Sequence, residues 1–190
     1  MKKHHHFLIY KPYRMVSQFT SGDEKQLRKK RFLGELHEFP DGSMAVGRLD
    51  ENSEGLLLIT TNGKWSDEVN KSKEYEKEYY AQLDGIVSKE ALEKLEKGVF
   101  ISVESKKYLT QPARVKTIAT PTLPATKQRI RDDRHGPTSW ISITITEGKF
   151  RQVRKMCSAV GFPVLRLARV RIGNYTLETL GDNMVVEVNP

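Results

Sequence analysis

Runs of apolar residues predict a protein that is richer in strands than in helices. The strongest signal lies at Ile141, Ile143 and Ile145, which alternate with hydroxyl-bearing residues and predict a half-buried strand. Leu56–Ile59 is apolar without a break, which is typical of a strand that is buried on both faces. Further strands are predicted at residues 7–10, 79–83, 99–103, 163–172 and 185–188.

Two longer segments instead have apolar residues at helical spacing. A helix is predicted over Ser88–Lys97, with Ser88 as its N-terminal cap and Gly98 at its end. A second helix is predicted over Arg151–Val160, and a short one capped by Ser66 is also expected. Because the helices do not alternate strictly with the strands, the pattern favours an α+β protein with a mixed sheet over a doubly wound fold.

The composition is that of a folded protein. With 190 residues, of which 37% are hydrophobic, the chain can bury a core as a single domain over residues 1–190 or as two tightly joined halves. Its one cysteine, Cys157, excludes a disulfide framework and a cysteine-rich metal site. No apolar run approaches membrane-spanning length and no signal segment follows the start, so we expect a cytoplasmic protein with no membrane partner.

The net charge of +8 suggests a polyanionic partner, either nucleic acid or an anionic membrane surface. The histidines at His4–His6 have three interpretations: metal ligands, the remnant of a purification tag, or a native polar tail. No acidic or cysteine residue lies near them in the sequence to complete a metal site, so we expect no metal.

A charged loop at residues 47–55, GRLDENSEG, is enclosed by two apolar segments. This position would hold a carboxylate such as Asp50 rigidly at the edge of a sheet. The pattern alone favours an ordinary connection in which Asp50 and Ser53 bond to nearby amides. The loop also allows an acid/base pair of the glycosidase type, formed from Asp50 with Glu51 or Glu54.

Basic residues gather toward the C-terminal side of the chain. Between residues 149 and 171 there are seven of them and no acidic residue. They are Lys149, Arg151, Arg154, Lys155, Arg166, Arg169 and Arg171. This run suits contacts with phosphates, and the alternative is a solvated helix face. Tyr75, Tyr79 and Tyr80 lie among lysines and glutamates and would either stack on bases or pack on a sheet.

Four of these segments together resemble the pseudouridine synthases of the RsuA/RluA-like superfamily. GRLDENSEGLLLITTNG at 47–63 is close to the superfamily's signature, and KEYYA at 77–81 fits its second motif. The third motif is matched by GKFRQVRKM at 148–156 and by VGFPVLRLARVRIG at 160–173. The order and spacing agree, and the likeness covers residues 10–173.

Within the superfamily, the chain is most similar to the E group, which acts on large-subunit ribosomal RNA. YKPYRMVSQFT at 10–20 and PTSWISITITEGKFRQVRKM at 137–156 carry that likeness. Many relatives begin with a small S4-type RNA-binding domain. There is no room for one before Phe7, which also fits the E group. Ala81, where valine is more frequent, and Thr61–Gly63, which lacks an aspartate, are departures without an expected catalytic consequence.

The resemblance implies the isomerisation of a specific uridine to pseudouridine in ribosomal RNA, expected to be 23S RNA of the large subunit. It also implies a mixed, largely antiparallel sheet with flanking helices and a central cleft. No cofactor is expected, since the reaction needs no oxidation, energy input or external water. We also expect the protein to be a monomer.

The resemblance assigns roles to individual residues. Asp50 matches the catalytic aspartate, and Arg154 matches the basic residue that pairs with it. Tyr79 matches the tyrosine that stacks on the target uracil, and Arg48 matches the arginine that props open the RNA stack. The other residues expected to bind RNA are Lys149, Arg151, Lys155 and Arg169.

Three questions stay open at this point. Asp50 would either attack the sugar or remove a sugar proton, and the sequence does not separate these routes. The target uridine is not encoded in a recognisable way, although residues 21–31 and 120–139 are candidates for selecting it. A non-catalytic RNA-binding or ribosome-assembly protein is the alternative function, which explains the charge but not the Asp50 loop.

Overall fold

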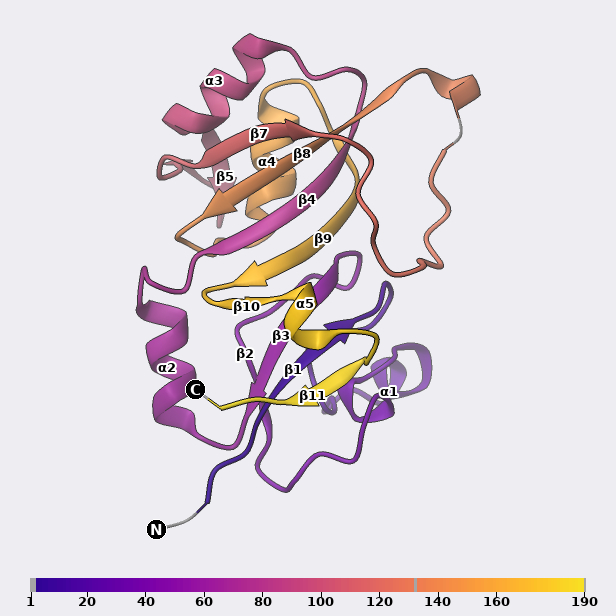
Figure 1. The fold of residues 1–190 in the computed structure, drawn as a ribbon, viewed down its shortest axis with the longest axis vertical. Helices are drawn as coiled ribbons and strands as arrows, with labels where there is room; N and C mark the ends of the chain where they lie inside the picture. Colours follow the sequence, from indigo (N-terminus) through magenta and orange to yellow (C-terminus); the bar gives the residue numbers. More distant parts are fainter. Residues whose placement is uncertain (1–2, 132, 190) are drawn as a thin grey trace. The chain divides into compact units, whose positions relative to one another are not determined.

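The computed structural model describes residues 3–131 and 133–189 (Figure 1). The chain divides into two compact units. Unit 1 contains Met1–Tyr75 and Arg169–Pro190, and unit 2 contains Glu76–Ala168. The expectation of a single domain over residues 1–190 stays a prediction. The α+β class with a mixed, largely antiparallel sheet is confirmed, and the central cleft stays a prediction.

Unit 1 is built around β1 and β3, two strands in which every residue is buried. Its strand order is β11-β1-β3-β9, with β2 paired to β3 and β10 paired to β9. The strands are β1 (His6–Lys11), β2 (Met44–Val46), β3 (Glu54–Thr60), β9 (Val164–Ile172, which begins in unit 2), β10 (Tyr175–Thr176) and β11 (Val185–Glu187). The pairs β1–β11, β1–β3, β2–β3 and β9–β10 are antiparallel.

Two apolar clusters explain the unbroken apolar run of β3. Leu56 and Leu58 pack in one cluster with Trp65, whereas Leu57 and Ile59 pack in another with Leu33. Alternate residues of a strand point to opposite faces, so each face of β3 has its own core. The predicted buried strand is therefore confirmed.

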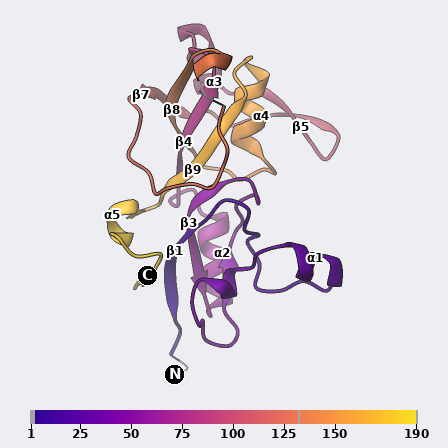
Figure 2. The ribbon, with the colours of Figure 1, turned by 90° about the vertical axis from the view of Figure 1, so that its right-hand side faces the viewer.

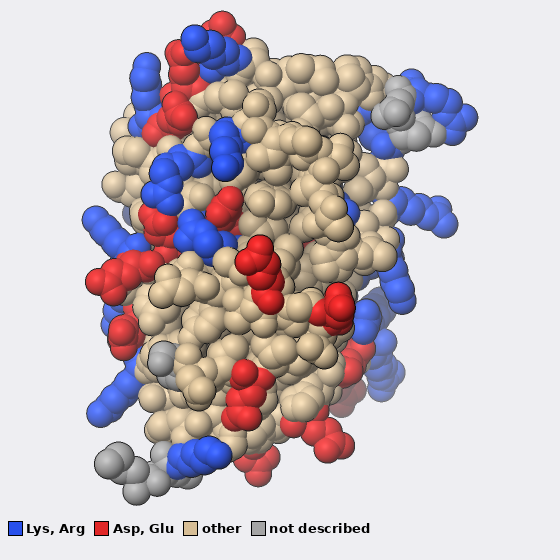
Figure 3. All heavy atoms as spheres, viewed as in Figure 1, with Lys and Arg blue, Asp and Glu red and all other residues tan. Residues whose placement is uncertain are grey.

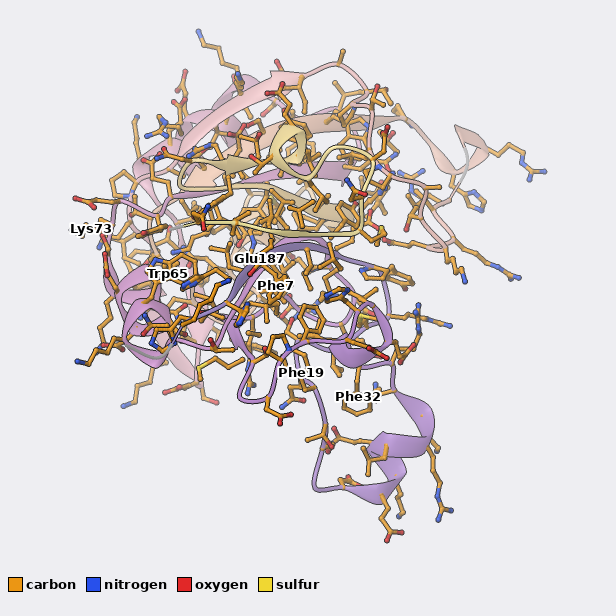
Figure 4. All side chains as sticks on the ribbon, turned by 60° about the horizontal axis from the view of Figure 1, so that its bottom comes forward. Phe7, Phe19, Phe32, Trp65, Lys73 and Glu187 are labelled. Carbon is orange, nitrogen blue, oxygen red and sulfur yellow. The ribbon has the colours of Figure 1, made fainter. Side chains whose placement is uncertain are left out.

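Unit 1 also contains short helices, of which α1 projects away from the strands and buries none of its residues (Figure 2). They are α1 (Glu24–Lys29), the 3-10 helix η1 (Leu33–Glu35), α2 (Gly63–Lys71) and α5 (Leu177–Leu180). On the η1 side, the Phe39 ring lies edge-on to the rings of Phe7 and Phe19, with centroids 5.3 Å away in both cases. Figure 4 shows Phe7 and Phe19 on this side of the unit.

The expected cap at Ser66 is wrong. Helix α2 begins at Gly63, and the Asn62 side chain accepts hydrogen bonds from the backbone N–H groups of Lys64 and Trp65, at 3.1 and 3.3 Å. Ser66 is instead buried within the first turn. Asparagine is one of the residues most favoured as an N-terminal cap.

Unit 2 has the strand order β9-β4-β8-β7 and a separate two-stranded hairpin. The sheet strands are β4 (Lys77–Asp84), β7 (Arg114–Ile118) and β8 (Thr138–Ile145), and the hairpin strands are β5 (Phe100–Val103) and β6 (Lys106–Leu109). Helices α3 (Lys89–Lys97), α4 (Gln152–Ala159) and the 3-10 helix η2 (Asp133–His135) complete the unit. The cap of α3 is Ser88, whose hydroxyl accepts from the Ala91 N–H, so that prediction is confirmed.

Strand β8 departs from its predicted half-buried state. Its hydroxyl-bearing residues Ser142 and Thr144 are buried together with the isoleucines. The Ser142 hydroxyl donates to a carboxylate oxygen of Glu78 across the β4–β8 pair, at 2.7 Å. Because a satisfied hydroxyl can be buried at little cost, alternation of hydroxyl-bearing and apolar residues does not require an exposed face.

Residues 120–131, within the segment 120–139 that is a candidate for target selection, form a long loop. Residues 120–131 contain neither helix nor strand, and residue 132 lies outside the described residues. A guanidinium nitrogen of Arg166 donates to the Pro124 carbonyl oxygen at 2.7 Å, which ties the loop to β9.

A tight turn joins β5 and β6. Val103 and Lys106 are paired, so only Glu104 and Ser105 connect the strands. Both residues have positive φ angles, 48° and 64°. This is the conformation of a type I′ hairpin turn, in which glycine and asparagine are preferred because a Cβ atom is strained there.

We predict that Ser105→Gly stabilises the protein. Glycine relieves the strain at φ 64°, and this gain exceeds the added entropy of the unfolded chain, for a net increase of roughly 0.5–1 kcal/mol in the free energy of unfolding. Urea denaturation measures the change. Ser105→Ala is the matched control, because it keeps the Cβ atom and should leave the stability close to that of the wild type. Equal midpoints for all three proteins would contradict this account of the turn.

Candidate active site

The Asp50 loop lies in unit 1 and leads directly into β3. The Ser53 N–H donates to the Asp50 carbonyl oxygen at 3.0 Å, which closes a turn. Leu49 is buried, whereas Arg48 is exposed and Asp50 is half-buried. The apolar side chain of Leu49 therefore anchors the turn, while the charged residues on either side of it retain contact with solvent.

Hydrogen bonds from outside the turn fix the backbone on both sides of Asp50. The buried Ser17 hydroxyl accepts from the Leu49 N–H at 3.0 Å and donates to the Leu49 carbonyl oxygen at 2.8 Å. The Arg14 N–H donates to the Glu51 carbonyl oxygen at 2.8 Å. The Lys30 ammonium also pairs with the Glu51 carboxylate at 2.5 Å. Asp50 is thus carried on a peptide segment with little freedom to move.

Gly55 allows β3 to run close to β9. Its φ angle is +111°, and a Cβ atom at this position would lie 2.2 Å from the Arg169 carbonyl oxygen. A contact that short with backbone atoms has no flexible neighbour to relieve it. The glycine five residues after Asp50 is therefore required by the packing of unit 1.

Three charged side chains are buried in the strands next to the Asp50 turn, those of Lys11, Glu54 and Arg169. Lys11 is fully buried, and its ammonium donates to the carbonyl oxygens of Met15 and Pro12 at 2.7 and 3.0 Å. Glu54 and Arg169 are also buried, and the Arg169 Nε donates to the Leu56 carbonyl oxygen at 2.7 Å. The predicted contact of Arg169 with RNA stays a prediction.

The environment of Lys11 lowers its pKa to about 7. Burial is the main cause, because it penalises the charged ammonium. The charges of Glu54, Asp50 and Glu51 oppose the change, and the charge of Arg169 adds to it. Lys11 is therefore electrostatically coupled to the carboxylate of Asp50, and the two groups share one charged network.

This lowered pKa predicts a pH dependence of stability. Between pH about 7 and the ordinary lysine value of 10.5, the unfolded chain holds a proton that the folded chain lacks. The free energy of unfolding should therefore rise with pH in this window, by up to about 1.4 kcal/mol per pH unit. Below pH about 7 the lysine is protonated in both states, so it should contribute no pH dependence.

Urea denaturation of wild type and Lys11→Met at several pH values tests this dependence. The stability difference between the two proteins should grow in favour of the wild type from pH 7 to pH 10. Lys64→Met, at an exposed position of α2, is the control and should follow the wild type. Parallel curves for wild type and Lys11→Met would show that Lys11 stays charged when the protein is folded.

Tyr79 and Arg154 both lie in unit 2. Tyr79 is buried on β4, directly opposite Ile143 of β8, and shares its face of the strand with Ala81 and Leu83. Arg154 is half-buried on α4, and one guanidinium nitrogen donates to the Val164 carbonyl oxygen at 3.2 Å. The stacking role of Tyr79 and the pairing of Arg154 with Asp50 stay predictions.

The turn between β8 and α4 carries the basic residues of the third motif. The Lys149 N–H donates to the Gln152 side-chain oxygen at 2.9 Å, and the Gln152 N–H donates to the Lys149 carbonyl oxygen at 3.0 Å. The Gln152 amide nitrogen also donates to Glu147 at 2.6 Å. This network fixes a turn in which Arg151 adopts a positive φ of 53°. The structure therefore brings Lys149, Arg151, Arg154 and Lys155 together in one short segment.

The predicted site residues fall in both units. Arg48, Asp50 and Arg169 belong to unit 1. The residues in unit 2 are Tyr79, Lys149, Arg151, Arg154 and Lys155. In the view of Figure 3, basic and acidic side chains are interspersed, so the net charge of +8 is not gathered into one basic surface on that face.

Three supporting residues were missed by the sequence analysis. Lys11 carries a weak signal, because it is a charged residue at the end of an apolar run. Ser17 and Gln152 lie within the segments that carry the family resemblance, but their roles depend on hydrogen bonds that only the folded chain forms. Both residues support the site through its backbone.

Among residues 3–131 and 133–189, no group of three or more His, Cys, Asp or Glu side chains is placed to hold a metal ion. Of the N-terminal histidines, His6 is buried beside Trp65, and the His5 Nδ1 lies 2.9 Å from a carboxylate oxygen of Glu187. In the same part of the chain, no helix has the length and apolar character needed to cross a membrane.

Comparison with known proteins identifies the family. Residues 5–159 match the family described as RNA pseudouridylate synthase. The chain is 40% identical over 182 residues to ribosomal large subunit pseudouridine synthase E of Vibrio parahaemolyticus, covering 95% of this chain and 72% of that protein. It is 37% identical over 175 residues to the protein of the same name from Xanthomonas axonopodis, covering 91% and 88%.

A solved structure agrees with the sequence comparison. The crystal structure of a pseudouridylate synthase aligns with a TM-score of 0.74 and 25% identity, over 100% of this chain and 72% of that one. The chain belongs to the RNA pseudouridylate synthase family. The resemblance inferred from the sequence motifs is thereby confirmed.

Proposed function

We propose that this protein isomerises one uridine of large-subunit ribosomal RNA to pseudouridine, acting in the cytoplasm as a monomer. The observation that carries the proposal is the Asp50 turn, in which the half-buried Asp50 lies on a backbone that hydrogen bonds fix at the residues on both sides of it. Family membership supplies the reaction, and the relatives named for large-subunit RNA support the substrate.

The reaction exchanges one bond for another without any added group. The bond between the sugar and N1 of uracil breaks, the base turns, and the sugar carbon joins C5 of the base. The hydrogen on C5 leaves as a proton, and N1 takes up a proton. A single carboxylate is sufficient, either as a nucleophile toward the sugar or as a base toward a sugar proton. The fixed backbone around Asp50 supports both routes, because each requires a well-aimed carboxylate.

The other motif residues are proposed to handle the flipped base. A stacked uridine must leave its helix, at a cost of a few kcal/mol. Arg48, which is exposed beside Asp50, would fill the vacated space, and Tyr79 would stack on the uracil. Arg154 would aim the Asp50 carboxylate through a charge-assisted hydrogen bond.

Basic residues are proposed to hold the RNA backbone. Lys149 is exposed on the fixed turn before α4, and Arg151, Lys155 and Arg169 complete the proposed set. We propose that residues 21–31 and 120–139 select the target uridine. Contacts with phosphates predict binding that weakens steeply as salt is added.

The Asp50→Asn variant tests the catalytic assignment. The amide has the same shape but cannot act as nucleophile or base, so folding and RNA binding should persist while pseudouridine formation falls below detection. Mass spectrometry of purified large-subunit RNA after incubation measures the product. Asp41→Asn is the matched control, because Asp41 is an exposed aspartate of the same unit, and this variant should remain active. Substantial product from Asp50→Asn would refute the role of Asp50.

The Arg154→Met variant tests the proposed partner of Asp50. Loss of the guanidinium should lower the single-turnover rate by about 100-fold or more, since one pre-positioned donor is removed. Arg154→Lys keeps the positive charge and should recover part of the rate. Circular dichroism checks that the bond to the Val164 carbonyl is not essential for folding. An Arg154→Met protein that reacts as fast as the wild type would exclude the pairing.

The two alternative functions make different predictions. A glycosidase would need Glu54 beside the substrate as a second acid, but Glu54 is only 2% exposed. A non-catalytic RNA-binding protein would bind ribosomal RNA and leave it unmodified, and it gives no reason for the fixed backbone around Asp50.

A further inference from the structure

Three lysines of unit 2 lie over aromatic rings on neighbouring elements. The Lys107 ammonium is 4.2 Å from the centroid of the Phe100 ring, within the β5–β6 hairpin. The Lys155 and Lys149 ammonium groups lie 5.2 and 5.0 Å from the ring centroids of Phe150 and Tyr108. Each distance is within the range of a cation–π interaction.

The same residues join the hairpin to the start of α4. The Lys155 ammonium donates to the Ser102 carbonyl oxygen of β5 at 2.6 Å, while it also faces the Phe150 ring. On the other strand, the Tyr108 hydroxyl donates to a carboxylate oxygen of Glu147 at 2.6 Å. Figure 2 shows the hairpin beside α4, in agreement with these contacts. Phe100, Lys107 and Leu109 share the outward face of the hairpin, and Lys155 joins the β5 edge to Phe150. Tyr108 and Lys106 lie on the opposite face with the buried Ile101.

This surface exposes apolar area that a soluble protein would normally bury. Phe150 is 71% exposed, and Phe100 and its cross-strand neighbour Leu109 are 55% and 51% exposed. Isolated exposed apolar residues need no explanation, but several on one ordered surface indicate a binding role. The lysines and the hairpin hold the rings in place, so little conformational entropy would be lost when a partner binds them.

The charge around the rings favours RNA as the partner. Lys107 and Lys155 place positive charge over the exposed rings of Phe100 and Phe150, and Lys149 is next to Phe150 in the chain. The nearby Glu147 carboxylate is engaged by Tyr108 and Gln152 and by a backbone N–H. Flat rings flanked by cations match the unpaired bases and phosphates of single-stranded RNA, because every base has a face to stack and a phosphate beside it.

We propose that Phe100, Phe150 and the lysines over and beside them form a stacking platform for unpaired bases of the substrate RNA other than the target uridine. This proposal rests on the proposed function for the identity of the RNA, but not for the binding itself. The platform gives the enzyme a way to recognise the single-stranded surroundings of its target, in addition to the phosphate contacts of the basic turn.

Fluorescence anisotropy with a single-stranded RNA of about ten nucleotides tests the platform. Phe100→Ala and Phe150→Ala should each weaken binding by about tenfold, because one stacked base is lost. Lys107→Gln should weaken it less. Ile86→Ala is the matched control, since Ile86 is 61% exposed in the same unit and is not part of the surface. Duplex RNA should show little difference between the variants and wild type, because its bases are already stacked.

Single-turnover assays on large-subunit RNA separate the platform from the proposed function. The phenylalanine variants should need about tenfold more RNA to reach half of their maximal rate. If wild type forms no pseudouridine but the phenylalanine variants still lose oligonucleotide binding, the proposed function fails and the platform stands. If wild type modifies the RNA and the variants bind the oligonucleotide as tightly as wild type, the platform is overturned.

Sedimentation velocity tests the competing occupant of this surface, a second copy of the chain. A wild-type dimer that Phe100→Ala and Phe150→Ala dissociate, without loss of RNA affinity, would overturn the proposal. A wild-type monomer, together with the tenfold loss of RNA affinity in the variants, supports it.

Discussion

The close approach of the backbones at Gly55 and Arg169 is the constraint on which unit 1 depends. A Cβ atom at position 55 would overlap the Arg169 carbonyl. Beside this approach Arg169 is buried with its Nε on the Leu56 carbonyl. Lys11, which pairs with Gly55 across β1 and β3, is buried with its ammonium on the Met15 and Pro12 carbonyls. Buried charges are tolerated only when they are paired or hydrogen-bonded, and here each cation has backbone oxygens to bind.

This packing has a direct consequence for the chemistry. The turn that carries Asp50 ends where β3 enters the constrained region, and its backbone is bonded to Ser17 and Arg14 from a segment more than 30 residues earlier in the chain. The proposed isomerisation relies on one carboxylate, so it depends mainly on how accurately that group is positioned. The hydrogen bonds of the turn hold the backbone of Asp50 in one position before the substrate binds.

Local patterns predicted those features that depend on local forces. The apolar run of β3 and the cap and stop of α3 have reasons within a few residues, and they were predicted correctly. The motif at 47–55 identified the family because its residues are contiguous. The burial of Lys11 and the Ser17 bonds to Leu49 were not predictable, because they join residues that are distant in sequence. The roles of Tyr79 and Arg154 likewise rest on the motifs alone.

The most direct test of the central claim is a map of pseudouridines in ribosomal RNA from cells that lack this protein. The map should be compared with maps from cells supplied with the wild-type chain or with Asp50→Asn. The account predicts that one position of large-subunit RNA loses its pseudouridine, regains it with the wild type and stays unmodified with Asp50→Asn. Identical maps with and without the protein, or full restoration by Asp50→Asn, would contradict it.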